Sequence, residues 1–371
     1  MPRRQPIRIA VHAAAVVALW VAAIWPAAAR AASAPPAPGL QECRLRGLEH
    51  AAWCGTLSRP LSAAAPQGPK ITLHYAVLPA LARLPKPDPV FFFAGGPGQS
   101  AIDLAAPVAR MLARFSNRRD LVLIDQRGTG RSAPLACADD DVPTQALAQS
   151  LDEAAAQSEL AQCRQDLERL PYGDLRHFTT VEAAGDAEAV RQALGAPQVN
   201  LVGVSYGTRV ALEYLRQAPG AVRRVVLDGV APPDMALPAA FARDAQSAFD
   251  ALLTWCAGDA ACHARHPQLA AQWQALLAGL PRPVLLVHPV TGREERVTLT
   301  REALAGLVRA PLYAPALAAG LPLAIEEAAS GRWSALTGLA LALGGGSVGR
   351  IAQGQHFAVL CSEDMPRVDA A

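Results

Sequence analysis

The sequence predicts an α/β fold in which a mostly parallel sheet is flanked by helices. Between about residues 70 and 230, short runs rich in β-branched or aromatic residues alternate with amphipathic segments. Strands that are apolar along their whole length are typical of a parallel sheet covered on both faces. The chain has 371 residues, 51% hydrophobic and 18% charged, which is enough for one large core or two domains.

The first strands are predicted from three short apolar runs. These are ITLHYAVLP (71–79), PVFFFAG (89–95) and RDLVLIDQ (119–126). The second run enters a turn, AGGPG (94–98), with three glycines and a proline, more than a chain reversal needs. Because glycine lets the backbone approach a ligand closely, we expect this turn to line a site.

Helix and strand patterns continue to about residue 230. Residues 179–195 have the periodicity of a helix, and Thr179 with Glu182 forms a capping box at its start. They are followed by a strand at 199–204, a helix at 208–219 and a strand at 222–230. We assign residues 33–235 to the first part of the sheet domain.

A change of pattern follows Pro233. Residues 236–357 are mostly helical in character and contain one hairpin-like stretch at 283–300. We predict that they form a helical cap on the sheet. Residues 358–371 are predicted to begin the return to the core.

The N-terminus has the layout of a secretory signal. Arg3, Arg4 and Arg8 precede an apolar run over residues 9–29, and small residues follow it. We expect residues 1–32 to be a signal peptide; the alternative is an uncleaved N-terminal anchor, which would be the chain's only membrane contact. Either alternative predicts an exported protein, periplasmic or extracellular.

Seven cysteines fit an oxidising compartment. Nearest-neighbour spacing suggests three disulfides and leaves Cys361 without a partner. The suggested pairs are Cys43–Cys54, Cys137–Cys163 and Cys256–Cys262. No cysteine has zinc-site spacing, so no metal site is expected.

The segment Gly203-Val204-Ser205-Tyr206-Gly207 is a G-x-S-x-G motif between a predicted strand and a predicted helix. In a nucleophile elbow this strained turn exposes a serine at a helix N-terminus. The N–H of Tyr206 and one from the earlier loop, Gly96 or alternatively Gly95, would then stabilise an oxyanion. A purely structural turn is the competing interpretation.

Four segments together resemble the prolyl and tripeptidyl aminopeptidase branch of the α/β-hydrolases, which are exported bacterial serine peptidases with a helical cap. These are GGPG (95–98), DQRGTGRS (125–132), GVSYGTRVALEYLRQAP (203–219) and VVLDGVAPPD (225–234). The resemblance covers roughly residues 40–371. Ala94 stands where prolyl iminopeptidases have histidine, which favours the tripeptidyl-like subgroup. Asp125 and Arg127 are expected to brace their loop by hydrogen bonds.

The resemblance also implies an Asp and a His on late strands after the cap, and no segment of that kind follows residue 358. We therefore expect the late strands to be missing and the far edge of the sheet to be open, as in a truncated chain. The remaining histidines that could act as a base are each expected to have a surface or packing role. They are His263, His266, His288 and His356.

The expected function is an exported aminopeptidase that cleaves N-terminal residues from peptides through an acyl-enzyme on Ser205. Glu363 and Asp364 would face the amino terminus of the substrate if the cap folds over the elbow. A carboxylic-ester hydrolase or a catalytically inert, truncated product are the alternatives. No cofactor is expected; with a net charge of +2 and no basic stripe, neither is nucleic acid. The sequence does not indicate an oligomeric state.

Overall fold

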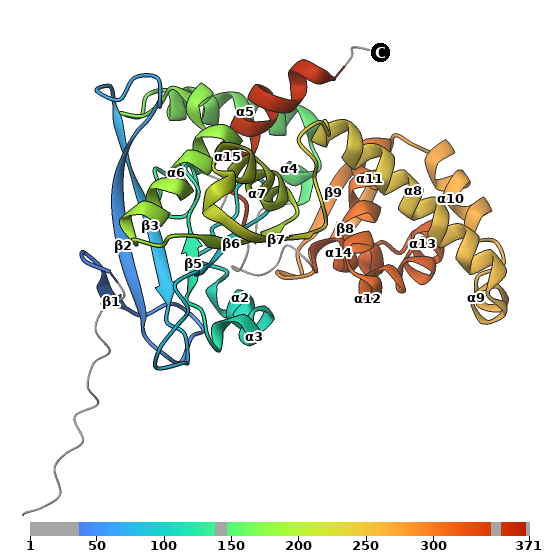
Figure 1. The fold of residues 1–371 in the computed structure, drawn as a ribbon. Coiled ribbons are helices and arrows are strands. Elements are labelled where there is room, and N and C mark those ends of the chain that lie inside the picture. The colour runs from blue at the N-terminus through green and yellow to red at the C-terminus, as the bar shows by residue number, and fades with distance from the viewer. Residues whose placement is uncertain (1–36, 138–146, 343–349, 369–371) are drawn as a thin grey trace, which may run out of the picture. The chain divides into compact units, whose positions relative to one another are not determined.

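A computed structural model of the protein describes residues 37–137, 147–342 and 350–368 (Figure 1). Within them, seven strands form one mixed sheet in the order β1-β2-β3-β5-β4-β6-β7. The strands are β1 (Gln41–Cys43), β2 (Ala52–Pro60), β3 (Lys70–Leu78), β4 (Val90–Phe93), β5 (Leu121–Ile124), β6 (Val199–Val204) and β7 (Val222–Asp228).

Strands β5, β4, β6 and β7 run parallel to one another, and β1, β2 and β3 are added at one end by antiparallel pairing. This confirms the predicted α/β sheet and all five of its predicted strands. The pattern did not predict β1 and β2, because β2 contains glycine, proline and half-exposed polar positions rather than an apolar run. At the other end, β7 pairs with β6 alone within the described residues, and Val226 is 46% exposed.

Helices cover both faces of the parallel strands. Phe91 and Phe93 pack in one hydrophobic cluster with residues of α6 (Thr180–Ala193) and α7 (Tyr206–Gln217). Phe92, which points to the opposite face, packs in a second cluster with residues of the short helix α2. Helix α2 spans Ala105–Met111 and is followed by the short helix α3 (Ala113–Ser116).

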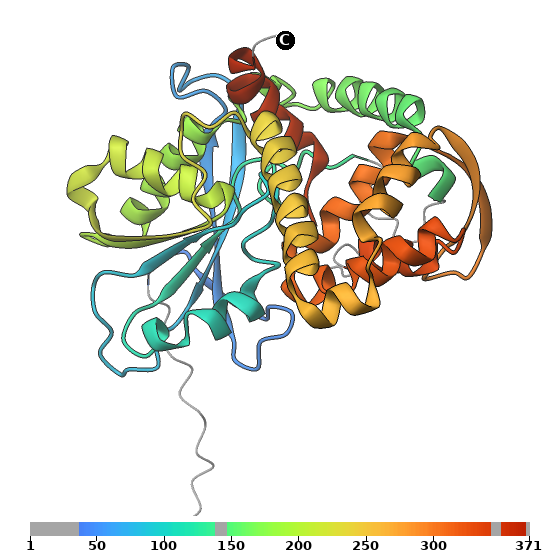
Figure 2. The ribbon, with the colours of Figure 1, turned by 90° about the vertical axis from the view of Figure 1, so that its right-hand side faces the viewer.

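Residues 237–341, here called the helical region, are mainly helical (Figure 2). They contribute most residues of a separate hydrophobic cluster. The elements of the helical region are α8 (Leu237–Gly258), α9 (Ala260–Arg265), α10 (Leu269–Ala278), β8 (Arg282–Val287), β9 (Glu294–Leu299), α11 (Arg301–Arg309), α12 (Pro315–Ala318), α13 (Leu321–Ala329) and α14 (Ser334–Leu341). Strands β8 and β9 pair antiparallel, as the hairpin pattern predicted. The boundaries of the cap and its role as a lid over the site remain predictions.

Three further helices come from other parts of the sequence. Helix α4 (Leu147–Ser150) joins the helical region, where the Ala148 N–H donates to the Glu295 carboxylate over 3.0 Å. It is followed by α5 (Glu153–Glu168). After the helical region, α15 (Gln353–Val359) packs back on the sheet domain and is followed by single turns at Leu360–Asp364 and Met365–Arg367.

The three predicted disulfides are confirmed, with Cα–Cα distances of 5.8 Å, 5.4 Å and 5.1 Å. Cys361 is exposed and forms no disulfide within the described residues. The predicted signal or anchor at 1–32 lies outside those residues. Among the helices that are described, none has the length and apolar character needed to cross a membrane.

Candidate active site

Ser205 lies at the junction between β6 and α7 in a strained conformation. Its φ of 54° and ψ of −125° fall outside the regions that non-glycine residues normally occupy. The strain, of order 1–3 kcal/mol, is held by hydrogen bonds on both sides. The Ser205 N–H donates to the Asp228 carbonyl over 2.8 Å, and the Thr208 hydroxyl donates to the Ser205 carbonyl over 2.6 Å. The side chain of Ser205 is exposed, as a nucleophile requires.

The two glycines of the motif are needed because the elbow packs its backbone tightly. A Cβ atom at Gly207 would lie 2.1 Å from the Phe93 carbonyl oxygen, far inside contact distance. A Cβ atom at Gly203 would lie 2.4 Å from the Gly207 carbonyl oxygen. Helix α7 can therefore start directly against β4 only with these residues, which is why the spacing of the motif carries structural information.

The glycine-rich loop, residues 94–98, follows β4 and lies beside this elbow. Strands β4 and β6 are parallel neighbours with Phe93 opposite Gly203, so both strands end at the same edge. A Cβ atom at Gly95 would lie 3.1 Å from Ser205 Cβ. Gly96 has a φ of +109°, a conformation that favours glycine. The structure thus brings Gly95 and Ser205 together; the oxyanion role of Gly95, Gly96 and Tyr206 remains a prediction.

Asp125 braces the segment that follows the glycine-rich loop. It accepts hydrogen bonds from the Ser100 hydroxyl over 2.6 Å and from the Ile102 N–H over 3.1 Å. Burial raises the pKa of the Asp125 carboxyl to about 6, because a charged carboxylate is poorly solvated there. This is the bracing role that the sequence suggested.

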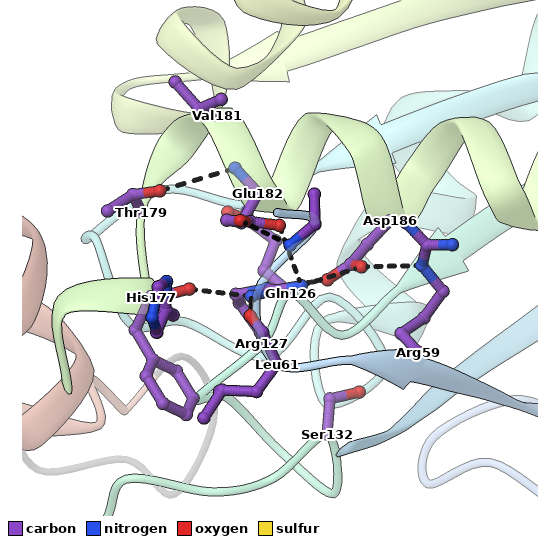
Figure 3. Close-up of polar contacts among 12 residues, drawn as sticks. Arg59, Leu61, Gln126, Arg127, Ser132, His177, Thr179, Val181, Glu182 and Asp186 are labelled. Atoms are coloured by element: carbon purple, nitrogen blue, oxygen red, sulfur yellow. Dashed lines mark hydrogen bonds and ion pairs between the residues drawn. The ribbon is translucent and has the colours of Figure 1, made fainter. Parts of the chain in front are cut away.

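Arg127 is a second brace, and its guanidinium is completely buried. It pairs with Asp186 of α6 through Nε at 2.8 Å and Nη2 at 2.9 Å (Figure 3). Its Nη1 donates to the Leu61 and His177 carbonyl oxygens, both over 2.7 Å. Arg59 reaches the same Asp186 carboxylate at 3.0 Å. With this many protein partners, Arg127 has a structural role.

Three of the four histidines considered as bases lie in the helical region. His266 Nδ1 is 2.6 Å from the Glu326 carboxylate. His288 Nδ1 accepts hydrogen bonds from two backbone N–H groups of its own turn. His263 is exposed on α9.

His356 on α15 has a different location, against the glycine-rich loop. Its Nδ1 donates to the Pro97 carbonyl over 3.1 Å, and burial lowers the pKa of its imidazole. The sequence did not indicate this contact, because the two residues are 259 positions apart. In the part of the chain that the structure describes, no hydrogen bond joins Ser205 Oγ to a histidine.

Glu363 and Asp364 have hydrogen-bond partners on α6 and α7. The side chain of Asp364 is fully buried and accepts a hydrogen bond from Arg209 over 2.9 Å. Glu363 accepts two hydrogen bonds from Thr180, from its N–H over 2.5 Å and from its hydroxyl over 2.7 Å. Contact between these carboxylates and a substrate amino group remains a prediction. Neither Thr180 nor Arg209 was singled out from the sequence, although Arg209 belongs to a quoted segment.

Comparisons with known proteins show the family to which the chain belongs. Residues 88–306 match the sequence model of a family described as the alpha/beta hydrolase fold. The chain is similar to serine protease Hip1 of Mycobacterium tuberculosis, with 29% identity over 305 residues that cover 78% of this chain and 58% of that protein.

Two further relatives align over shorter regions. The tripeptidyl aminopeptidase of Streptomyces lividans is 32% identical over 195 residues, which cover 48% of this chain and 35% of that protein. The proline iminopeptidase of Neisseria meningitidis is 30% identical over 142 residues, which cover 38% and 32% of the two chains. The chain thus matches only part of the length of these relatives.

Proposed function

Because this chain belongs to the alpha/beta hydrolase fold family, we propose that it is a serine hydrolase acting on peptides, with Ser205 as nucleophile. The observation that carries the proposal is the conformation of Ser205, which is strained, exposed and placed beside Gly95 at the edge where β4 and β6 end. Backbone strain of this kind persists where surrounding structure maintains it, and it is common at functional sites.

In the proposed reaction, Ser205 Oγ attacks the carbonyl carbon of the scissile peptide bond. The N–H groups of Tyr206 and Gly96, with Gly95 as the alternative donor, stabilise the oxyanion that forms. Collapse of this intermediate expels the amine and leaves an acyl-enzyme, which water then hydrolyses. The Ser205 proton has to pass to a general base within hydrogen-bond reach during the attack, and the same group returns it to the nitrogen of the amine as it leaves.

Peptides are the proposed substrates because the relatives are named as a serine protease, a tripeptidyl aminopeptidase and a proline iminopeptidase. We propose cleavage from the amino terminus, with the region 236–357 limiting access as a cap. Export is proposed as well: the three disulfides are typical of proteins in oxidising compartments. The signal or anchor at 1–32 would direct it to the periplasm or the cell exterior.

The test compares chromogenic amides with esters on the protein expressed from its whole reading frame. Tripeptidyl, prolyl and single aminoacyl p-nitroanilides are assayed beside a p-nitrophenyl acyl ester. We expect amide turnover that disappears in Ser205→Ala and persists in Ser247→Ala, a control at an exposed serine within the regular helix α8. Turnover of the ester alone would assign an ester hydrolase, and no Ser205-dependent turnover would indicate an inert protein.

A further inference from the structure

Residues 351–364, here called the return segment, follow the helical region and contact the glycine-rich loop. The Ala352 N–H donates to the Gly98 carbonyl over 2.9 Å. A Cβ atom at Gly98 would lie 2.7 Å from the Ala352 carbonyl oxygen, so the two backbones are closely packed. One turn further along, His356 donates to the Pro97 carbonyl over 3.1 Å. The start of the return segment therefore fixes this loop.

The other end of the return segment reaches the residue that follows the nucleophile. The Glu363 carboxylate accepts hydrogen bonds from both the N–H and the hydroxyl of Thr180. The Thr180 hydroxyl oxygen lies 2.8 Å from the Tyr206 hydroxyl oxygen, in hydrogen-bond contact. Tyr206 is 2% exposed, so this contact is shielded from water. A chain of hydrogen bonds thus connects the return segment to Tyr206, the second proposed oxyanion donor.

A buried ion pair secures the same end. Arg209 lies one turn after Tyr206 on α7 and donates from Nη1 to Asp364 over 2.9 Å. The side chains of Arg209 and Asp364 are 2% and 0% exposed. Separating a buried pair leaves an uncompensated charge in the protein interior, which is strongly unfavourable. The position of the return segment relative to α7 is therefore tightly constrained.

We propose that Thr180 and Glu363 are positioning residues that hold the Tyr206 N–H at a fixed place relative to the glycine-rich loop. The same return segment holds both groups, one at each end. The inference rests on the proposed function, because two donors stabilise one oxyanion only when both lie about 3 Å from it. A displacement of about 1 Å in such a site costs up to about 100-fold in rate.

The test uses two buried tyrosines of the same helix. Tyr206→Phe removes the hydroxyl that contacts Thr180 and leaves the backbone N–H in place. Tyr214→Phe is the matched control, since Tyr214 is also fully buried on α7 and its hydroxyl donates instead to Glu188 over 2.6 Å. We expect Tyr206→Phe to lower kcat about tenfold with little change in KM, and Tyr214→Phe to change kcat less than about twofold.

Substitutions at Thr180 supply the second arm. Thr180→Val removes the hydroxyl at nearly constant volume and is expected to lower kcat as Tyr206→Phe does. Thr180→Ser keeps the hydroxyl, so its kcat should stay close to the wild-type value. Equal kcat losses for Tyr206→Phe and Tyr214→Phe, at similar melting temperatures, would overturn the proposal and leave the hydrogen bonds a role in stability alone.

A third measurement does not depend on activity. Amide hydrogen exchange is followed in peptides covering 93–99 and 203–209 for the same variants. Faster exchange in Tyr206→Phe and Thr180→Val than in Tyr214→Phe supports positioning even if the wild-type protein has no Ser205-dependent turnover and the proposed function fails. Unchanged exchange at both peptides in Tyr206→Phe would contradict the positioning role, whatever the activity.

Discussion

The buried carboxyl of Asp125 makes a specific prediction about stability and pH. Its pKa is about 6 in the folded protein, against 3.8 for an ordinary aspartate. Each pKa unit corresponds to about 1.4 kcal/mol, so the difference of about two units is worth about 3 kcal/mol. Burial is the largest cause, opposed by hydrogen bonds from Ser100 and Ile102.

The sign follows from proton binding. Between pH 3.8 and about 6, the folded protein binds more protons at Asp125 than the unfolded chain does. Stability therefore falls as pH rises through this window, and the loss is complete above the folded-state pKa. Below pH 3.8 the carboxyl is protonated in both states, so its contribution no longer depends on pH.

Urea unfolding of the wild type and Asp125→Asn at a series of pH values measures this contribution. The variant's free energy of unfolding, minus that of the wild type, should rise by about 3 kcal/mol from pH 3.8 to pH 7. Asparagine alters the hydrogen bonds too, but that offset does not vary with pH. Glu188→Gln is a control of opposite sign, since Arg191 holds the pKa of Glu188 at about 2. A difference that does not change with pH for Asp125→Asn would contradict a raised pKa of Asp125 in the folded protein.

Three further predictions concern stability. Gly207→Ala should destabilise the protein by about 3 kcal/mol or more, because the new methyl would overlap the backbone of β4; a melting temperature near that of the wild type would contradict this packing. Arg127→Met leaves the buried Asp186 carboxylate with Arg59 as its ion-pair partner, and should lower the free energy of unfolding in urea by about 3–5 kcal/mol. A loss under 1 kcal/mol would show that the pair between Arg127 and Asp186 is not needed. Replacing Cys137 and Cys163 by alanine removes a link across 26 residues and should cost about 3 kcal/mol, which unchanged calorimetric stability of the double variant would rule out.

Much of the parallel half of the fold could be predicted from the sequence because its strands are buried on both faces. Residues such as Phe91, Phe92 and Phe93 form a continuous apolar run, and each face of that run has a helix to pack against. The antiparallel β1 and β2 were not predicted, since one-sided burial and a glycine give no such run. The disulfide pairs were predictable because nearest neighbours in sequence were also neighbours in space.

The site was predictable only where its residues are local in sequence. The elbow around Ser205 and the loop at 94–98 each carry a motif with a steric reason, which the positions of Gly95 and Gly207 show. The contacts of the return segment join residues such as Thr180 and Glu363, which are 183 positions apart. No local pattern encodes such a contact, because it depends on how the helical region returns the chain to the sheet.

The most direct test of Ser205 as the nucleophile is to trap the acyl-enzyme. The protein, expressed from its whole reading frame, is mixed with a slowly deacylating p-nitrophenyl ester, quenched in acid and digested for mass spectrometry. We predict one acyl group per protein on the peptide that contains Ser205, and none in Ser205→Ala. An acyl group on another residue, or p-nitrophenol release at the wild-type rate in Ser205→Ala, would contradict this prediction.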